Sequence, residues 1–368
     1  APFIGLTGHS HMDTAWLWTS KETIRKNART FSNALNLMEQ YPEYRFIQSS
    51  PIHAEMVLNH YPDLFKRVAE KVAEGRWEPN GGMYVEADGN MPAGESFIRQ
   101  FLYGQAFTQK HFDYRADTFW LPDTFGYSAA LPQIMRGCGI KYFLTTKLSW
   151  NDTNTFPYDT FTWKGIDGSD VLVHFNRQGG APDAGSLYKG VEEGRLLHTD
   201  ISDKRLCSYG KGDGGGGPTF EEIELARRVR DLQGCPRSEH MSVSDFMEVL
   251  EQDQELYPVY NGELYVELHR GVLTVVAPIK KLNRRAESTL RDLELMDVLG
   301  STVGLNRFDP DKLLSLWKVL LNNQFHDILP GTSIPEEHDE AIRALTELVE
   351  ESTSAFRKRL GQVQEDSP

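Results

Sequence analysis

Apolar residues follow two alternating patterns over the first three quarters of the chain. Short uninterrupted apolar runs, typical of buried strands, are followed by stretches in which apolar residues recur every three or four positions, as on one face of a helix. This alternation predicts an α/β fold of parallel strands with right-handed helical crossovers, and about seven or eight such units predict a barrel. The expected strands are 3–6, 45–48, 77–82, 118–121, 141–145, 171–175, 206–209 and 258–266; the expected helices are 15–39, 53–74, 95–110, 131–136 and 221–232.

The period changes after about residue 275. Apolar residues then recur at helical spacing in three stretches, which start at Ile279, Leu313 and Ala341. Three amphipathic helices with short links predict a helical bundle. We therefore expect two domains, a catalytic barrel over residues 1–274 and a bundle over residues 275–368.

Composition narrows the possible partners and location. The 368 residues carry a net charge of −14, which argues against nucleic acid and anionic membranes as partners. No apolar run reaches the length of a membrane span. The three cysteines, Cys138, Cys207 and Cys235, form no paired motif, which favours a reducing, cytoplasmic location. No signal peptide is visible, but the chain begins almost directly on a strand, as expected of a piece of a longer protein.

The first stretch with chemical potential follows the first expected strand and reads His-Ser-His-Met-Asp-Thr-Ala-Trp from His9 to Trp16. Residues two apart on an extended segment face the same way, so His11 and Asp13 can point at one metal ion. A turn histidine beside a helix-capping aspartate is the alternative interpretation.

Two further stretches offer the same types of ligand. Asp123 follows the strand at 118–121 in a turn rich in proline, glycine and aromatic residues, including Phe125, where it is either a functional acid or a turn former. His326 and Asp327 stand where Pro330 and Gly331 are expected to end a helix. One interpretation is a surface pair stabilised by the helix dipole. The other is that the bundle supplies a ligand at the barrel rim.

A glycine-rich run extends from Tyr209 to Pro218. The spacing does not match a Walker phosphate loop, because no Gly-Lys-Ser/Thr sequence follows, and Pro218 interrupts a dinucleotide-binding pattern. A flexible linker is one remaining interpretation. The other is a mobile loop that carries Asp213 to the barrel rim, with glycines that let the backbone approach a ligand.

Two more polar groups follow expected strands. Glu86 and Asp88 come after the strand at 77–82, and His269 and Arg270 come after the last strand. Carboxylates at such positions suit a hydroxyl-rich ligand, but each group can equally be structural.

Together these stretches resemble glycoside hydrolase family 38, the zinc-dependent retaining α-mannosidases, over nearly all of residues 3–360. The resemblance is to the cytosolic and bacterial branch, which typically carries the glycine-rich Gly-Asp-Gly-Gly-Gly-Gly-Pro loop and Gly-Glu-Leu-Tyr-x-Glu-x-His-Arg-Gly, here Gly262 to Gly271. The resemblance implies a seven-stranded β/α barrel followed by a three-helix bundle.

It also implies roles for individual residues. Zn²⁺ would be bound by His11, Asp13, Asp123 and His326, with Co²⁺ as another possible divalent ion, and His9 or Asp327 would orient a ligand histidine. Asp123 would also be the nucleophile and Asp213 the general acid/base of a retaining mechanism. The remaining substrate-binding candidates are Trp16, Phe125, Asp88, Asp327, His269 and Arg270.

The implied substrate is a mannose-containing oligosaccharide from which terminal α-linked mannose is removed. Members of the family also carry β-rich domains after the bundle, which help to complete the substrate site. The resemblance further implies a homo-oligomer that forms through the full-length chain. A zinc-dependent carbohydrate de-N-acetylase is one alternative, although its usual H-x-x-x-H spacing is not seen. A non-catalytic sugar-binding fragment is the other; it would tolerate Asp123→Asn, whereas a mannosidase would lose turnover.

Overall fold

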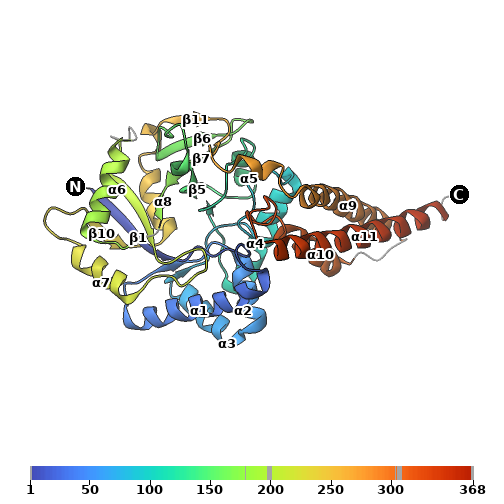
Figure 1. Cartoon of the computed structure of the whole chain (residues 1–368), viewed down its shortest axis with the longest axis horizontal. Coiled ribbons are helices and arrows are strands. Elements are labelled where there is room, and N and C mark those ends of the chain that lie inside the picture. The colour runs from blue at the N-terminus through green and yellow to red at the C-terminus, as the bar shows by residue number, and fades with distance from the viewer. Residues whose placement is uncertain (1, 179, 197–200, 303, 305–308, 366–368) are drawn as a thin grey trace.

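The computed structural model describes residues 2–178, 180–196, 201–302, 304 and 309–365, and its strands form two sheets (Figure 1). The larger sheet has the order β3-β2-β1-β9-β8, with β10 also pairing with β1, and all its pairs are parallel. Its strands are β1 (Phe3–His9), β2 (Phe46–Ile47), β3 (Trp77–Glu78), β8 (Arg177–Gln178), β9 (Lys204–Tyr209) and β10 (Arg237–His240).

The second sheet has the order β11-β6-β7-β5-β4. Its strands are β4 (Thr118–Trp120), β5 (Tyr142–Thr145), β6 (Thr160–Lys164), β7 (Asp170–Phe175) and β11 (Val259–Asn261). β4, β5 and β7 are parallel, but β6 runs antiparallel to β7 and was not expected from the sequence. A hairpin return therefore interrupts the regular strand–helix alternation at this point.

The expected closed seven-stranded barrel is not confirmed. The strands form two sheets, and in the second sheet β6 and β11 run opposite to β4, β5 and β7. β7 and β8 are separated by Asn176 alone, so one continuous segment joins the two sheets. Within the described residues no backbone ladder joins β3 to β4. There the Asn80 side chain accepts a hydrogen bond from the backbone N–H of Thr118 at 3.2 Å. The Asn80 side chain thus links the two segments in place of a backbone hydrogen-bond ladder.

Helices surround the sheets, and their bounds differ from the expectation at turn-forming residues. The helix expected over 53–74 is two helices, because Pro62 has no N–H to continue the first one. The helix expected from residue 15 begins only at Ser20, since the preceding segment forms part of the site. These helices are α1 (Ser20–Gln40), α2 (Pro51–His60), α3 (Pro62–Ala73), α4 (Gly94–Phe112), α5 (Leu131–Gly137), α6 (Ala184–Leu196), α7 (Phe220–Val229) and α8 (Val243–Glu251).

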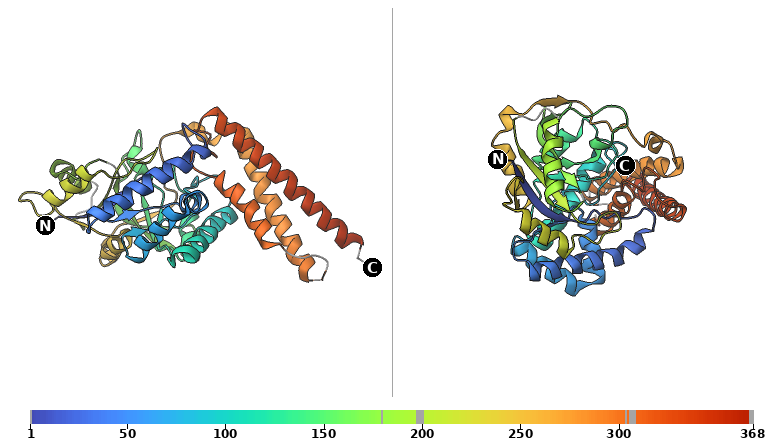
Figure 2. Two further views of the ribbon diagram at one scale, coloured as in Figure 1. Left: turned by 90° about the horizontal axis from the view of Figure 1, so that it is seen from below. Right: turned by 60° about the vertical axis from the view of Figure 1, so that its left-hand side comes forward.

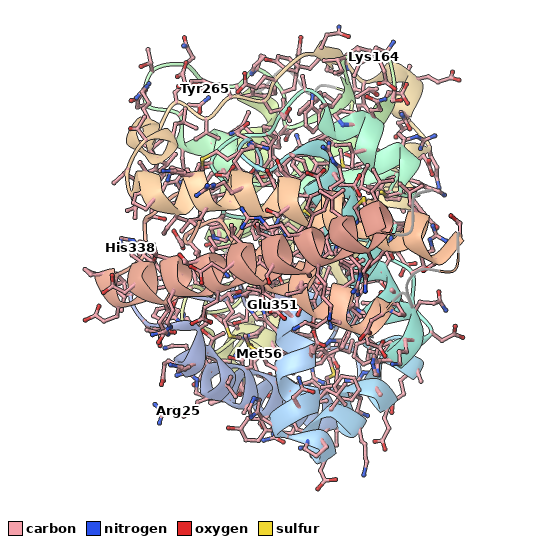
Figure 3. The ribbon with its side chains drawn as sticks, turned by 90° about the vertical axis from the view of Figure 1, so that its right-hand side faces the viewer. Arg25, Met56, Lys164, Tyr265, His338 and Glu351 are labelled. Carbon is pink, nitrogen blue, oxygen red and sulfur yellow. The ribbon has the colours of Figure 1, made fainter. Side chains whose placement is uncertain are left out.

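The C-terminal part contains α9 (Ala277–Thr302), α10 (Pro310–Asn322) and α11 (Pro335–Glu365), which pack against one another in all three pairs. Figures 1 and 2 show them projecting from one end of the sheets, and in Figure 3 α11, labelled at His338 and Glu351, runs beside α9. α10 ends at Asn322, earlier than the expected stop at Pro330 and Gly331. Residues 323–332 are consequently free to form a series of turns.

One apolar core joins the helices to the sheets. Trp317 of α10 and Leu290 of α9 belong to the same buried cluster as Phe101 of α4 and Phe143 of β5. None of the described helices combines the length and apolar character needed to cross a membrane. The shared core holds the turn after α10 in a constant position relative to the strand ends.

Candidate metal centre and catalytic cavity

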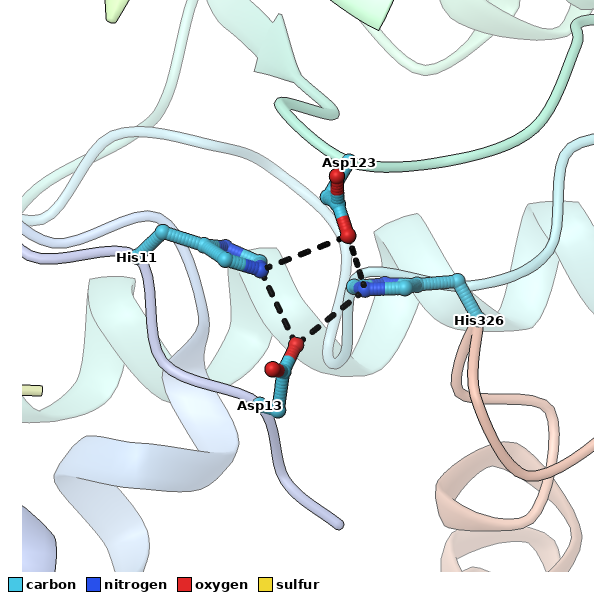
Figure 4. Close-up of side chains that lie close together, drawn as sticks. All are labelled: His11, Asp13, Asp123 and His326. Atoms are coloured by element: carbon cyan, nitrogen blue, oxygen red, sulfur yellow. Dashed lines mark hydrogen bonds and ion pairs between the residues drawn. The ribbon is translucent and has the colours of Figure 1, made fainter. Parts of the chain in front are cut away.

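Four side chains from three distant segments converge beyond the ends of β1 and β4 (Figure 4). His11 and Asp13 follow β1, Asp123 follows β4, and His326 lies in the turns after α10. One ligand atom from each residue can be chosen such that all four lie within 4.8 Å of one another. The structure thus brings together the four residues that the sequence predicted as metal ligands.

Asp13 and Asp123 lie between the two histidine rings. The Asp13 Oδ1 atom is 2.9 Å from His11 Nε2 and 3.4 Å from His326 Nε2. The Asp123 Oδ2 atom is 3.7 Å from His326 Nε2 and 4.0 Å from His11 Nε2. The buried Nε2 atom of His326 has no hydrogen-bond partner. Two imidazole nitrogens and two carboxylate oxygens suit a tetrahedral Zn²⁺ site, so the residues present fit the metal that the resemblance implies.

Burial and charge act in opposite directions on these histidines. Burial alone would lower the pKa of His326, but the Asp13 carboxylate beside its ring and the charges of Asp327 and Asp123 raise this pKa to about 9. The pKa of His11 is raised well above its usual value because Glu86 and Asp13 outweigh the effect of burial. A metal binds neutral imidazole, so a cation entering this site must displace protons.

Glu86 orients both histidines, a role that the sequence did not reveal. Its carboxylate Oε2 is 3.1 Å from His11 Nδ1, and its carbonyl oxygen is 3.0 Å from His326 Nδ1. Ser49 donates a hydrogen bond to the other carboxylate oxygen at 2.5 Å. His9, expected as a possible partner, instead stacks on Trp120 with ring centroids 4.3 Å apart. The only available sequence signal for Glu86 was its position after an expected strand.

The glycine-rich run brings Asp213 to the same place. The backbone N–H of Asp13 donates to the Asp213 carbonyl oxygen at 2.9 Å, so the loop is joined directly to a ligand segment. Asn33 of α1 donates to the carbonyl of Gly216 at 2.8 Å. Asp213 has a φ of +53°, a left-handed conformation that is uncommon for a residue with a side chain. Partial burial raises the pKa of its carboxyl group, as a proton donor requires.

A cavity of about 1080 Å³ extends from this cluster, and its walls include Asp213 and four of the predicted substrate-binding residues. These four are Trp16, Phe125, His269 and Asp327. The volume is ample for a sugar and part of its leaving group. Burial raises the pKa of Asp327 to about 6, and the Thr332 hydroxyl donates a hydrogen bond to its carboxylate.

Asp88 and Arg270 do not line this cavity. The buried Asp88 carboxylate accepts hydrogen bonds from the backbone N–H groups of Asn90 and Met91 at 2.9 and 2.7 Å. Arg270 pairs with Asp152 through two hydrogen bonds, at 2.8 and 3.0 Å. Both side chains thus have structural partners, and their role toward substrate stays a prediction.

Two family models together match nearly the whole chain. Residues 3–263 match the glycosyl hydrolases family 38 N-terminal domain, and residues 267–363 match the alpha mannosidase middle domain. Alpha-mannosidase 2C1 of Homo sapiens is 45 % identical over 345 residues, which is 92 % of this chain and 33 % of that protein. Alpha-mannosidase of Saccharomyces cerevisiae is 40 % identical over 380 residues, 98 % of this chain and 34 % of that protein. The chain thus spans about a third of the length of these relatives.

Solved structures share the fold at low sequence identity. An alpha-mannosidase from Enterococcus faecalis V583 superimposes with a TM-score of 0.84 at 18 % identity, covering 99 % of this chain and 43 % of that one. The α-amylase AmyC from Thermotoga maritima has a TM-score of 0.62 at 13 % identity, covering 98 % of this chain and 93 % of that one. These likenesses concern the fold alone.

Proposed function

Because the chain belongs to glycosyl hydrolase family 38, we propose that it contains the catalytic centre of a zinc-dependent retaining exo-α-mannosidase. The substrates would be oligosaccharides or glycans with terminal α-linked mannose. The observation that carries this proposal is the convergence of His11, Asp13, Asp123 and His326 at a cavity that Asp213 also lines. A sugar-binding fragment would have no need for this arrangement of acids.

His11, Asp13, Asp123 and His326 would hold the metal, with Zn²⁺ favoured by the nitrogen and oxygen donors and Co²⁺ as an alternative. A bound zinc ion would act as a Lewis acid and template for the vicinal hydroxyls of the terminal sugar. Glu86 keeps the two imidazoles in one orientation from the opposite side. Trp16 and Phe125 provide apolar surface for the sugar ring, and His269 and Asp327 provide polar contacts.

The two acids would divide the chemistry. Asp123 attacks the anomeric carbon while Asp213 donates its proton to the leaving oxygen, which forms a mannosyl ester on Asp123. Asp213 then takes a proton from water, and the water oxygen replaces the ester at the anomeric carbon. The raised pKa of Asp213 suits the first of these tasks, because it keeps the acid protonated at higher pH.

We also propose that the architecture is the barrel and helical bundle expected from the family. The two sheets would be parts of one distorted seven-stranded β/α barrel over residues 1–274, and α9 to α11 would form a three-helix bundle over 275–368. The adjacency of β7 and β8 and the pairwise packing of the three helices support this division. The three cysteines are free, which supports a cytoplasmic location. A homo-oligomer would form through the full-length chain.

The test combines metal content with hydrolysis of 4-nitrophenyl α-mannoside by the purified chain. We expect about one zinc per chain, turnover that chelator abolishes and zinc restores, and retention of the anomeric configuration in the first product. A 5-fluoro-mannosyl fluoride should label Asp123, detected by peptide mass. Asp123→Asn should lose turnover; a variant that keeps it would contradict the proposed mechanism, and binding of mannosides without any turnover would favour the sugar-binding alternative.

A further inference from the structure

Lys147 makes a contact with Asp123 that the proposed function does not yet use. It is the first residue of a short 3₁₀ helix, Lys147–Trp150, which follows β5. The lysine is only 3 % exposed, and its ammonium group forms an ion pair with Asp123 Oδ1. The same Nζ atom lies 4.1 Å from the centroid of a Trp150 ring and 5.2 Å from that of Phe125.

This arrangement gives the two Asp123 oxygens different surroundings. Oδ2 faces the histidines of the metal centre, at 3.7 and 4.0 Å from their Nε2 atoms, whereas Oδ1 meets the lysine. A buried ammonium needs a counter-charge, and within the described part of the chain Asp123 is the carboxylate that supplies it. The aromatic rings beside it limit where the ammonium can move.

We propose that Lys147 accelerates the second half of the reaction, the release of mannose from Asp123. This inference rests on the proposed function. In that step water attacks the anomeric carbon, the carbon–Oδ1 bond breaks, and its electron pair returns to Asp123 while the water proton passes to Asp213. The ammonium beside Oδ1 stabilises the negative charge that develops there. Lys147 also keeps Oδ2 turned toward the metal centre in both halves of the reaction.

The test uses Lys147→Met with 2,4-dinitrophenyl α-mannoside, whose good leaving group makes the first half fast. We expect kcat to fall about tenfold, KM to fall with it, and a burst of about one dinitrophenolate per active site before the steady state. Lys147→Arg should recover most of the rate, because it keeps the charge. Should the Met variant fail to fold, Lys147→Gln serves with the same expectations.

Lys318→Met is the matched control. Lys318 of α10 forms an ion pair with Glu55 at 2.5 Å, and its Nζ lies 5.4 Å from the Tyr84 ring centroid, so the variant removes a similar contact away from the cavity. It should leave kcat, KM and the amplitude of any burst equal to those of the parent chain.

Two results for Lys147→Met would overturn the inference. The first is a kcat within twofold of that of the parent chain. The second is an equal fall in kcat and kcat/KM without a burst, because Lys147 would then act only in the formation of the mannosyl ester. A parent chain without turnover and without label on Asp123 would instead overturn the proposed function itself, and this inference with it.

Discussion

Two clusters of buried acids in this protein have opposite surroundings. In the first, Glu78 accepts hydrogen bonds from the backbone N–H groups of Val243 and Ser244 at 2.7 and 3.0 Å. Asn80 donates to Glu78 and to Asp117, at 3.0 Å in each case. The cluster of Glu78, Asn80, Asp117 and Ser244 therefore connects β3, β4 and α8 through neutral donors.

At the candidate metal centre, the inward-facing oxygens Asp13 Oδ1 and Asp123 Oδ2 have imidazole nitrogens and no neutral donors as neighbours among the described residues. Its carboxylates face imidazole nitrogens, and the buried atoms His326 Nε2 and Glu86 Oε2 have no hydrogen bond of good geometry. Buried polar groups usually find partners, so oxygen and nitrogen lone pairs that converge without neutral donors favour a bound cation. The presence or absence of neutral donors therefore distinguishes a structural acid cluster from a candidate functional one. Four experiments would sharpen or contradict this distinction.

The largest effect is expected from His326→Ala. Removing one ligand should reduce the zinc content to well below one per chain and lower turnover by roughly a thousandfold or more, about 4 kcal/mol of barrier. Metal analysis and mannoside hydrolysis measure the two effects. His60→Ala, which alters an exposed histidine at the end of α2, should leave both unchanged. Full zinc content in His326→Ala would contradict the assigned site.

The second prediction concerns pH. Because the metal-free pKa of His326 is about 9, this ring is protonated at neutral pH and must lose a proton when zinc binds. Zinc affinity should therefore fall as the pH falls, about tenfold per unit for each proton displaced, between pH 8 and 6. Competition with a chromophoric chelator measures it. An affinity that does not change over this range would mean that the histidines are neutral before metal binding.

Glu86→Gln should have a smaller effect, because it removes charge from the orienting group but leaves all four ligands. Zinc affinity should fall about 10–100-fold, with the stoichiometry at saturating zinc preserved. The matched control is Glu70→Gln, which alters an exposed glutamate of α3. Loss of stoichiometric binding in Glu86→Gln would make Glu86 a ligand.

The smallest effect on the reaction is expected at the structural cluster. Glu78→Gln weakens the acceptor of two backbone N–H groups, so the free energy of unfolding should fall by about 1–3 kcal/mol. Denaturant unfolding measures this change. Zinc content and turnover of the folded variant should match those of the parent. A loss of zinc in Glu78→Gln would remove the distinction between the two clusters.

Much of the fold was predictable because the local pattern of apolar residues is strong. The strand–helix alternation and the three late helices were expected, as were most strands that end near the site. The break before Pro62 has a local cause that the sequence carries, and the prediction overlooked it. The hairpin of β6 and β7 is also local, and the prediction overlooked it as well. The open edge between β3 and β4 depends on how distant segments pair, which the periodicity of one segment does not report.

The site shows the same division between local and distant information. The sequence by itself determined which residue types could bind a metal and perform acid–base chemistry: His11, Asp13, Asp123, Asp213 and His326. Only the tertiary structure decided that Glu86 orients the histidines and that Lys147 meets Asp123, since these contacts join segments with no shared sequence signal. The Glu86 carbonyl and the His326 ring are 240 positions apart and yet 3.0 Å from each other. Such a contact follows from how the packed core places the turn after α10 against the strand ends.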